Sequence, residues 1–153
     1  MADYEVTRSE TIAAPPALVH GFIDDFHRWP TWSPWEEIDP SMKREYSGPQ
    51  AGVGARYAWE GNRKAGKGNM EIVDSQPERV EVRLIFEKPF KGDNQVVFDL
   101  KPQDGGATDL TWTMHGSNKG MASLFTRVFG MDRMVGKDFE KGLARLKNAA
   151  EPG

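Results

Sequence analysis

The sequence contains no cysteine among its 153 residues. This absence excludes disulfide bonds, thiolate metal sites and cysteine nucleophiles. The chain also has no apolar run near the ~18 residues of a membrane-spanning helix, and its first residues, MADYEVTRSE, lack the apolar segment of a signal peptide. We therefore expect a cytoplasmic protein that does not insert into a membrane.

An excess of charge of one sign is lacking as well. The 20 Lys and Arg residues nearly balance the 23 Asp and Glu residues, and the net charge is −3. This balance argues against nucleic acid or an anionic membrane surface as a partner. With 38% hydrophobic and 28% charged residues, the composition is typical of a globular chain. We expect residues 1–153 to form a single domain with a sizeable core.

Motifs for metals, phosphates and hydrolysis are missing. His20, His27 and His115 are the only histidines, and none has the HxxxH or HxH spacing of a metal site. The glycines do not form GxGxxG or GxxxxGK[ST], and no serine lies in GxSxG. We expect no metal and no cofactor.

Strand-like segments dominate the first three quarters of the chain. Val, Thr, Ile and aromatic residues alternate with polar residues, and turns rich in Gly, Pro and Asp separate the segments. Because most of the segments follow each other without a helix, they predict an antiparallel sheet of six to seven strands. The predicted strands are residues 4–12, 42–46, 55–60, 68–74, 79–87, 94–101 and 108–116.

Alternation also predicts which face of the sheet is buried. Val80, Val82, Leu84 and Phe86 fall on one side of their strand, and charged residues fall on the other. By the same parity we expect these further side chains to face inward: Val96, Phe98, Leu100, Leu110, Trp112, Met114, Met70, Ile72, Tyr57 and Trp59.

Helical spacing appears at both ends of the chain. After Pro15 and Pro16, apolar residues three and four apart predict a short helix, or a helical pair, that ends near Arg28. One apolar stripe runs from Met121 to Phe129, and a longer one passes through Met131, Val135, Phe139, Leu143 and Leu146. An open sheet must cover its apolar face, so we expect the C-terminal helix to pack on it in an α+β fold.

Residues 29–40, WPTWSPWEEIDP, are unusually rigid and aromatic. They contain three of the five tryptophans, interleaved with Pro30 and Pro34. Binding residues concentrate on loops that a rigid scaffold holds. The segment is therefore either a cap on the core or the aromatic wall of a pocket, with Trp32 and Trp35 as the preferred lining pair.

Four phrases carry a resemblance to a known family. They are IAAPPALV at 12–19, WSPWEEIDP at 32–40, YSGPQAGVGARYAWEGN at 46–62 and DFEKGLARLK at 138–147. With the order of elements, they make the chain similar to the START-like, or SRPBCC, superfamily, in its polyketide cyclase/dehydrase branch. The resemblance implies a helix-grip fold: a curved sheet wrapped around the last helix, with a cavity for an apolar molecule between them.

The expected binding residues are the large, flexible or flat side chains of the inward face and the final helix. Methionine adapts to irregular guests, and tryptophan supplies contact area and one donor. The same residues would equally suit a closed core. They are Trp32, Trp35, Tyr57, Trp59, Met70, Leu84, Phe98, Trp112, Met114, Met131, Val135 and Phe139.

Three functions remain open from the sequence. The leading one is binding of a small hydrophobic molecule that is lipid-like, aromatic or polyketide-like. The alternative is a polyketide cyclase/dehydrase-type enzyme, which requires an ionisable group in the cavity; His20, Tyr57 and Asp138 are the candidates. A third is an interaction protein with a collapsed core. We expect a monomer or a homodimer.

Overall fold

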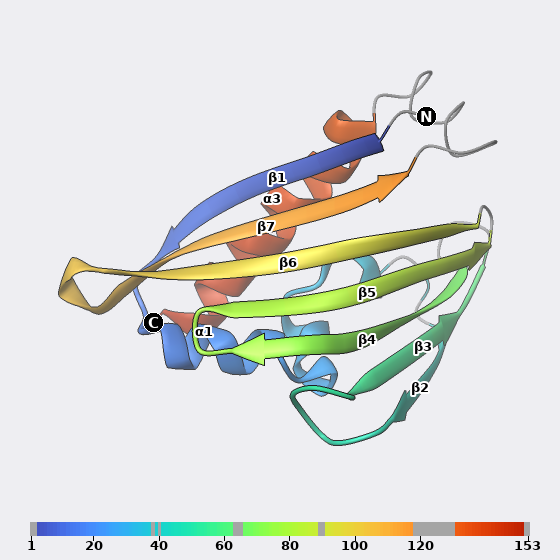
Figure 1. Ribbon diagram of the computed structural model, residues 1–153, viewed down its shortest axis with the longest axis horizontal. Helices are drawn as coiled ribbons and strands as arrows, with labels where there is room; N and C mark the ends of the chain where they lie inside the picture. Colours follow the sequence, from blue (N-terminus) through green and yellow to red (C-terminus); the bar gives the residue numbers. More distant parts are fainter. Residues whose placement is uncertain are drawn as a thin grey trace.

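The computed structural model describes residues 3–37, 39, 41–62, 66–88, 91–117 and 131–151, although not every side chain within them. A curved, seven-stranded antiparallel sheet has the order β1-β7-β6-β5-β4-β3-β2 (Figure 1). Its strands are β1 (Asp3–Ile12), β2 (Lys43–Ser47), β3 (Arg56–Glu60), β4 (Lys67–Gln76), β5 (Arg79–Lys88), β6 (Gly92–Gln103) and β7 (Ala107–Ser117). A short turn of 3₁₀-helix, η3 (Asp104–Gly106), joins β6 to β7.

Strand pairing confirms the predicted meander. Strands β2 to β7 pair in chain order, and β1 then pairs with β7, from Asp3 opposite Ser117 to Ile12 opposite Thr108. The predicted inward face is also confirmed, because Val80, Phe98 and Leu110 are completely buried while outward neighbours such as Arg83 and Asp99 are exposed.

The predicted final helix and the predicted N-terminal helical pair are both confirmed. Helix α3 (Met131–Ala150) is the final helix, and the pair consists of α1 (Pro16–Ile23), which begins after Pro15, and the 3₁₀-helix η1 (Phe26–Thr31). A second 3₁₀ turn in the tryptophan segment, η2 (Pro34–Glu37), was not predicted. Pro30 and Pro34 favour such short turns because proline cannot donate a helical hydrogen bond. The predicted stripe between Met121 and Phe129 lies outside the described residues.

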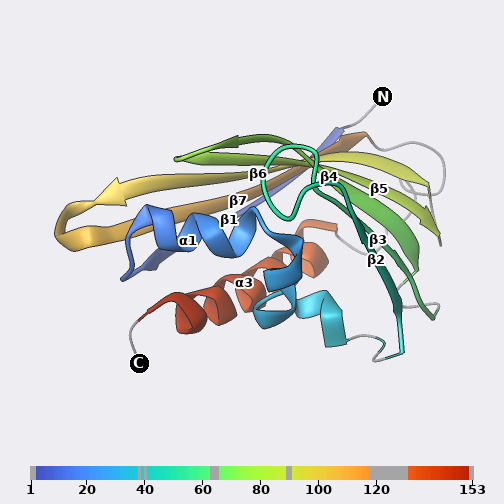
Figure 2. The same cartoon turned by 90° about the horizontal axis from the view of Figure 1, so that it is seen from below.

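Helices α1 and α3 lie on the same side of the sheet (Figure 2). Helix α3 packs mainly beside β1, and α1 contacts β6, β7 and α3. The core between these layers is a continuous cluster of aliphatic and aromatic side chains. The predicted α+β architecture, in which a curved sheet grips the last helix, is therefore confirmed.

Tryptophan side chains complete the C-terminal end of α1. The last carbonyls of a helix have no partner inside it. The indole of Trp29 donates to the carbonyl oxygen of Ile23 at 2.8 Å, and the indole of Trp32 donates to that of Phe22 at 2.9 Å. These two bonds attach η1 to the end of α1.

Polar contacts attach the end of α3 to the end of β1 and the residue that follows it. Lys147 donates from Nζ to the carbonyl of Thr11 at 3.0 Å and pairs with Glu151 at 2.5 Å. Oε2 of Glu151 also accepts the backbone N–H of Ala13 at 2.8 Å. These three contacts, which we call the C-terminal clamp, fix α3 beside β1.

Candidate functional site

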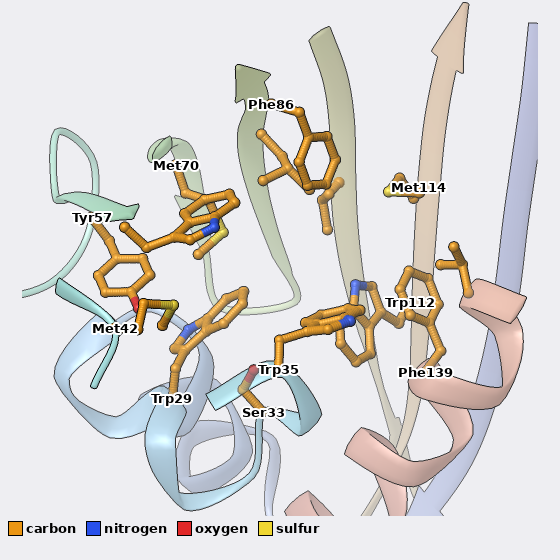
Figure 3. A pocket seen from close by; sticks show the side chains of 14 residues that line it. Trp29, Ser33, Trp35, Met42, Tyr57, Met70, Phe86, Trp112, Met114 and Phe139 are labelled. Atoms are coloured by element: carbon orange, nitrogen blue, oxygen red, sulfur yellow. The ribbon is translucent and has the colours of Figure 1, made fainter. Parts of the chain in front are cut away.

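A cavity of about 220 Å³ lies between the sheet and α3 (Figure 3). Its wall combines indole, phenyl, thioether and aliphatic side chains with two hydroxyl groups. The lining residues are Trp29, Ser33, Trp35, Met42, Tyr57, Trp59, Met70, Leu84, Phe86, Val96, Trp112, Met114, Val135 and Phe139.

The cavity lies towards one end of the inward face. Towards the end that α1 covers, Val80, Phe98 and Leu110 are completely buried in a closed core. Further along the same strands, Leu84 is only half-buried and Val96 and Met114 reach the cavity. Trp112 stands at the boundary between core and cavity, since its ring stacks on Phe98 and also lines the cavity.

The helix side of the cavity is built from stacked rings. Phe139 of α3 lies parallel to Trp112, with ring centroids 4.0 Å apart and planes 7° apart. Trp35 meets the Trp112 ring edge-on at 5.7 Å. The indole of Trp35 also donates to Oδ2 of Asp138 at 3.3 Å, which attaches η2 to α3.

The opposite side of the cavity is formed by β3 and β4. Tyr57 and Trp59 stack with centroids 6.2 Å apart. Trp59 lies opposite Gly68 in the register, and a Cβ atom at Gly68 would stand 2.6 Å from its ring. A glycine at this position therefore lets the indole lie flat across the neighbouring strand. Figure 3 shows Tyr57 and Met42 together at the Trp29 side of the cavity.

Most of the residues expected at the site lie together, two described ones lie elsewhere, and one has a side chain outside the described ones. Trp32 is completely buried behind the wall, where its N–H holds the end of α1 and its ring packs on Trp29. Phe98 lies in the closed core, two residues along β6 from the lining Val96. The side chain of Met131 lies outside the described ones. The expected residues that line the cavity are Trp35, Tyr57, Trp59, Met70, Leu84, Trp112, Met114, Val135 and Phe139.

Five lining residues were not among the expected binding residues. Phe86 and Val96 have the correct strand parity, so alternation contained the signal for them. Trp29 lies in a 3₁₀ turn and Ser33 lies between two such turns, where no periodic pattern operates; Met42 begins the predicted strand 42–46, in which the charged Arg44 interrupts the apolar alternation.

The three catalytic candidates lie in different environments. Tyr57 is 5% exposed and lines the cavity. Asp138 is half-buried and holds Trp35, so it stands behind the wall. His20 lies outside the cavity lining: its Nε2 is 3.1 Å from Oγ of Ser75, and its Nδ1 is 3.6 Å from Oδ2 of Asp24.

The contacts among Ser75, His20 and Asp24 join the end of α1 to β4. Burial raises the pKa of Asp24, and the neighbouring His20 opposes that shift. A hydrolytic triad would also need a substrate cleft and donors for an oxyanion. Since none of the three residues lines the cavity, we interpret the contacts as structural.

Three further observations concern the described residues. They contain no group of three or more His, Cys, Asp or Glu side chains that could hold a metal ion. His115 points away from the cavity to the outer face, where its Nδ1 is 3.1 Å from Oε2 of Glu5. No helix in these residues is long and apolar enough to cross a membrane.

Known structures with the same fold resemble the chain over nearly its whole length. Protein CV1439 from Chromobacterium violaceum has 18% identity and a TM-score of 0.68, with 97% of this chain and 98% of that chain covered. Ara h 8.0201 has 13% identity and a TM-score of 0.66, with 97% of this chain and 98% of that chain covered. The Aha1 dimer from Colwellia psychrerythraea has 16% identity and a TM-score of 0.64, with 98% of each chain covered. No curated protein matches the sequence.

The sequence itself matches one protein family, over residues 3–151. The match includes every described strand, the helices α1 and α3, and all the lining residues of the cavity. With its curved sheet, C-terminal helix and SRPBCC-like structural relatives, the chain belongs to the family described as polyketide cyclase/dehydrase and lipid transport.

Proposed function

We propose that the protein binds a small apolar molecule with at least one ring in the cavity between the sheet and α3. The observation that carries this proposal is the lining itself, in which four indoles and two phenyl rings surround about 220 Å³ of space. Burying apolar surface contributes about 25 cal/mol per Å², so an apolar guest gains affinity without any charge.

The size of the cavity limits the guest. A cavity of ~150 Å³ in another protein binds benzene. By proportion, a cavity of about 220 Å³ holds about nine non-hydrogen atoms, which corresponds to two fused rings. A long acyl or polyketide chain would need the cavity to open further.

Binding is better supported than catalysis. General acid–base chemistry needs an ionisable group within reach of the guest. Among the described residues, Tyr57 is the only ionisable side chain that lines the cavity, whereas Asp138 is occupied by the Trp35 indole. The cyclase/dehydrase alternative therefore depends on one phenol.

Two measurements test the binding proposal. Native mass spectrometry of protein purified from its own host, compared with the denatured mass, should reveal an apolar adduct that extraction can identify. The bicyclic hydrocarbon indane should bind the empty protein in calorimetry or ligand-observed NMR.

A filled cavity provides the matched test. Val96→Phe places a larger side chain at a lining position of β6 and should weaken indane binding at least tenfold, while Val73→Phe changes an exposed valine of β4 and should leave it unchanged. If indane fails to bind the unmodified protein, or binds the folded Val96→Phe variant equally well, the proposal is wrong.

A further inference from the structure

One polar atom in the cavity wall has no partner. The indole Nε1 of Trp112 is the only buried side-chain nitrogen or oxygen of the described residues without a hydrogen bond. The side chain itself is 2% exposed. Buried donors are nearly always paired, because an unpaired one loses its bond to water without replacement.

The indole N–H groups of three other tryptophans all donate a hydrogen bond. Trp29 and Trp32 donate to carbonyls at the end of α1, and Trp35 donates to Asp138. Trp112 differs although it belongs to the same aromatic cluster.

The Trp112 ring cannot turn to find a partner. The Phe139 ring stacks on the Trp112 ring with centroids 4.0 Å apart, and the Phe98 ring stacks on it with centroids 5.0 Å apart. A Cβ atom at Gly142 of α3 would stand 3.0 Å from the ring, so the helix backbone also lies close to it. The direction of the N–H is therefore fixed by the packing of β7 against α3.

The unpaired donor belongs to the cavity. Trp112 is a lining residue, and Figure 3 shows the nitrogen-bearing edge of its ring turned towards the cavity. A single water would satisfy the indole poorly, since buried waters typically make about three hydrogen bonds and most of this lining is apolar.

We propose that Trp112 Nε1–H is the polar anchor for the guest, which carries a carbonyl or ether oxygen on a skeleton of about two fused rings. The inference rests on the proposed binding function and adds an orientation to it. Indole donates and cannot accept. The guest must therefore supply an acceptor at this point and apolar surface elsewhere.

A matched pair of probes separates the anchor from the cavity. Indane and its ketone, 1-indanone, share one skeleton and differ by the acceptor. Indane binding tests the cavity alone. The ketone should bind the unmodified protein roughly three- to tenfold more tightly than indane, which is the net effect of one hydrogen bond.

NMR can detect a hydrogen bond at the Trp112 indole N–H directly. In proton–nitrogen correlation spectra, the Trp112 indole N–H signal should move downfield with 1-indanone and should move less, or in the other direction, with indane. Signals of the paired Trp29 and Trp32 indoles should show no such ketone-specific shift. This measurement uses only the unmodified protein.

Two variants complete the test. Trp112→Phe should reduce the preference for the ketone to less than twofold while indane still binds. Trp32→Phe removes a neighbouring indole that is already bonded and does not line the cavity, and it should keep the preference. If Trp112→Phe does not fold, replacing Trp112 with the sulfur isostere benzothienylalanine removes the N–H and keeps the ring.

The outcomes are distinct. Indane binding with an equal affinity for the ketone, or a preference that survives loss of the Trp112 N–H, overturns the anchor and leaves the binding function standing. If neither probe binds, the binding function and the anchor fail together.

Discussion

At the scale of single residues, the role of each tryptophan follows from the partner of its indole N–H. Trp32 was expected at the cavity, but its bond to the Phe22 carbonyl fixes it as part of the connection between α1 and η1. The indole of Trp35, three residues later, donates to Asp138 of α3 instead, and Trp35 lines the cavity. The residue type alone does not decide between these roles.

The Trp35 bond gives a prediction about ligand release. Asp138→Ala removes the acceptor that holds Trp35 against α3, so we expect indane to dissociate several-fold faster, as measured by NMR line shape. Asp138→Asn retains an acceptor oxygen and should behave nearly as the unmodified protein does. Equal rates in all three proteins would show that this bond does not hold the wall.

Asp39 gives a prediction about pH. The Ser41 hydroxyl and the backbone N–H groups of Asn62 and Ser41 donate to this carboxylate and lower the pKa of Asp39. A group with a lowered pKa stabilises the fold fully above the ordinary aspartate range, and this contribution is lost as the pH falls through the lowered value.

The unfolding free energy of Asp39→Asn, measured in urea, should therefore be below that of the unmodified protein at neutral pH. The difference should shrink as the pH falls below about 4. A difference that stays constant with pH would mean that the charge of Asp39 is irrelevant to stability.

At the scale of elements, β4 depends on a glycine where it crosses Trp59. A Cβ atom at Gly68 would meet the backbone carbonyl of Ile85 as well as the Trp59 ring. Because one of these neighbours is backbone, a rotamer change of Trp59 alone cannot relieve the contact.

We expect Gly68→Ala to destabilise the protein by about 1–3 kcal/mol and to alter the cavity wall at Trp59. Gly92→Ala on β6 is the matched control, since its Cβ would have only ordinary contacts of 3.5 Å and more. Thermal unfolding of both variants provides the measurement. Equal melting temperatures would show that the sheet adjusts at Gly68 without cost.

The same elements show how far the sequence could predict the site. Period-two alternation correctly predicts that Val96 and Phe98 share a face, but it contains no information about where along β6 the closed core ends. That boundary depends on where α1 lies against β6 and β7, which is a tertiary contact. Trp29 was missed because a 3₁₀ turn has no periodicity, and Met42 was missed because Arg44 interrupts the alternation of its predicted strand.

At the scale of the whole molecule, the C-terminal clamp joins the end of α3 to the end of β1. The Ala13 N–H and then Lys147 lower the pKa of Glu151, so the clamp is complete above the ordinary glutamate range and weakens in acid. It holds α3, one wall of the cavity, against β1.

Removing the clamp should loosen the molecule locally. In Glu151→Ala we expect faster hydrogen exchange at Ala13 and in the last turns of α3 at neutral pH, with slower exchange kept in β5 and β6. Glu140, on the same helix as Glu151, forms an exposed ion pair with Arg8 of β1; Glu140→Ala removes that pair and should leave the Ala13 amide protected. Equal protection of Ala13 in both variants would contradict the role of Glu151.

The pairing of β1 with β7 has a consequence during synthesis. Asp3 cannot pair with Ser117 until the chain between them has been synthesised. At the usual ribosomal speed of ~5–20 residues per second, this delay is roughly 6–20 s. Such distant pairing also slows folding, because a long loop must close before any contact compensates for it. Strand β1 is synthesised before the other strands of this sheet and is among the last to pair, so its unpaired backbone is open to other chains in the meantime.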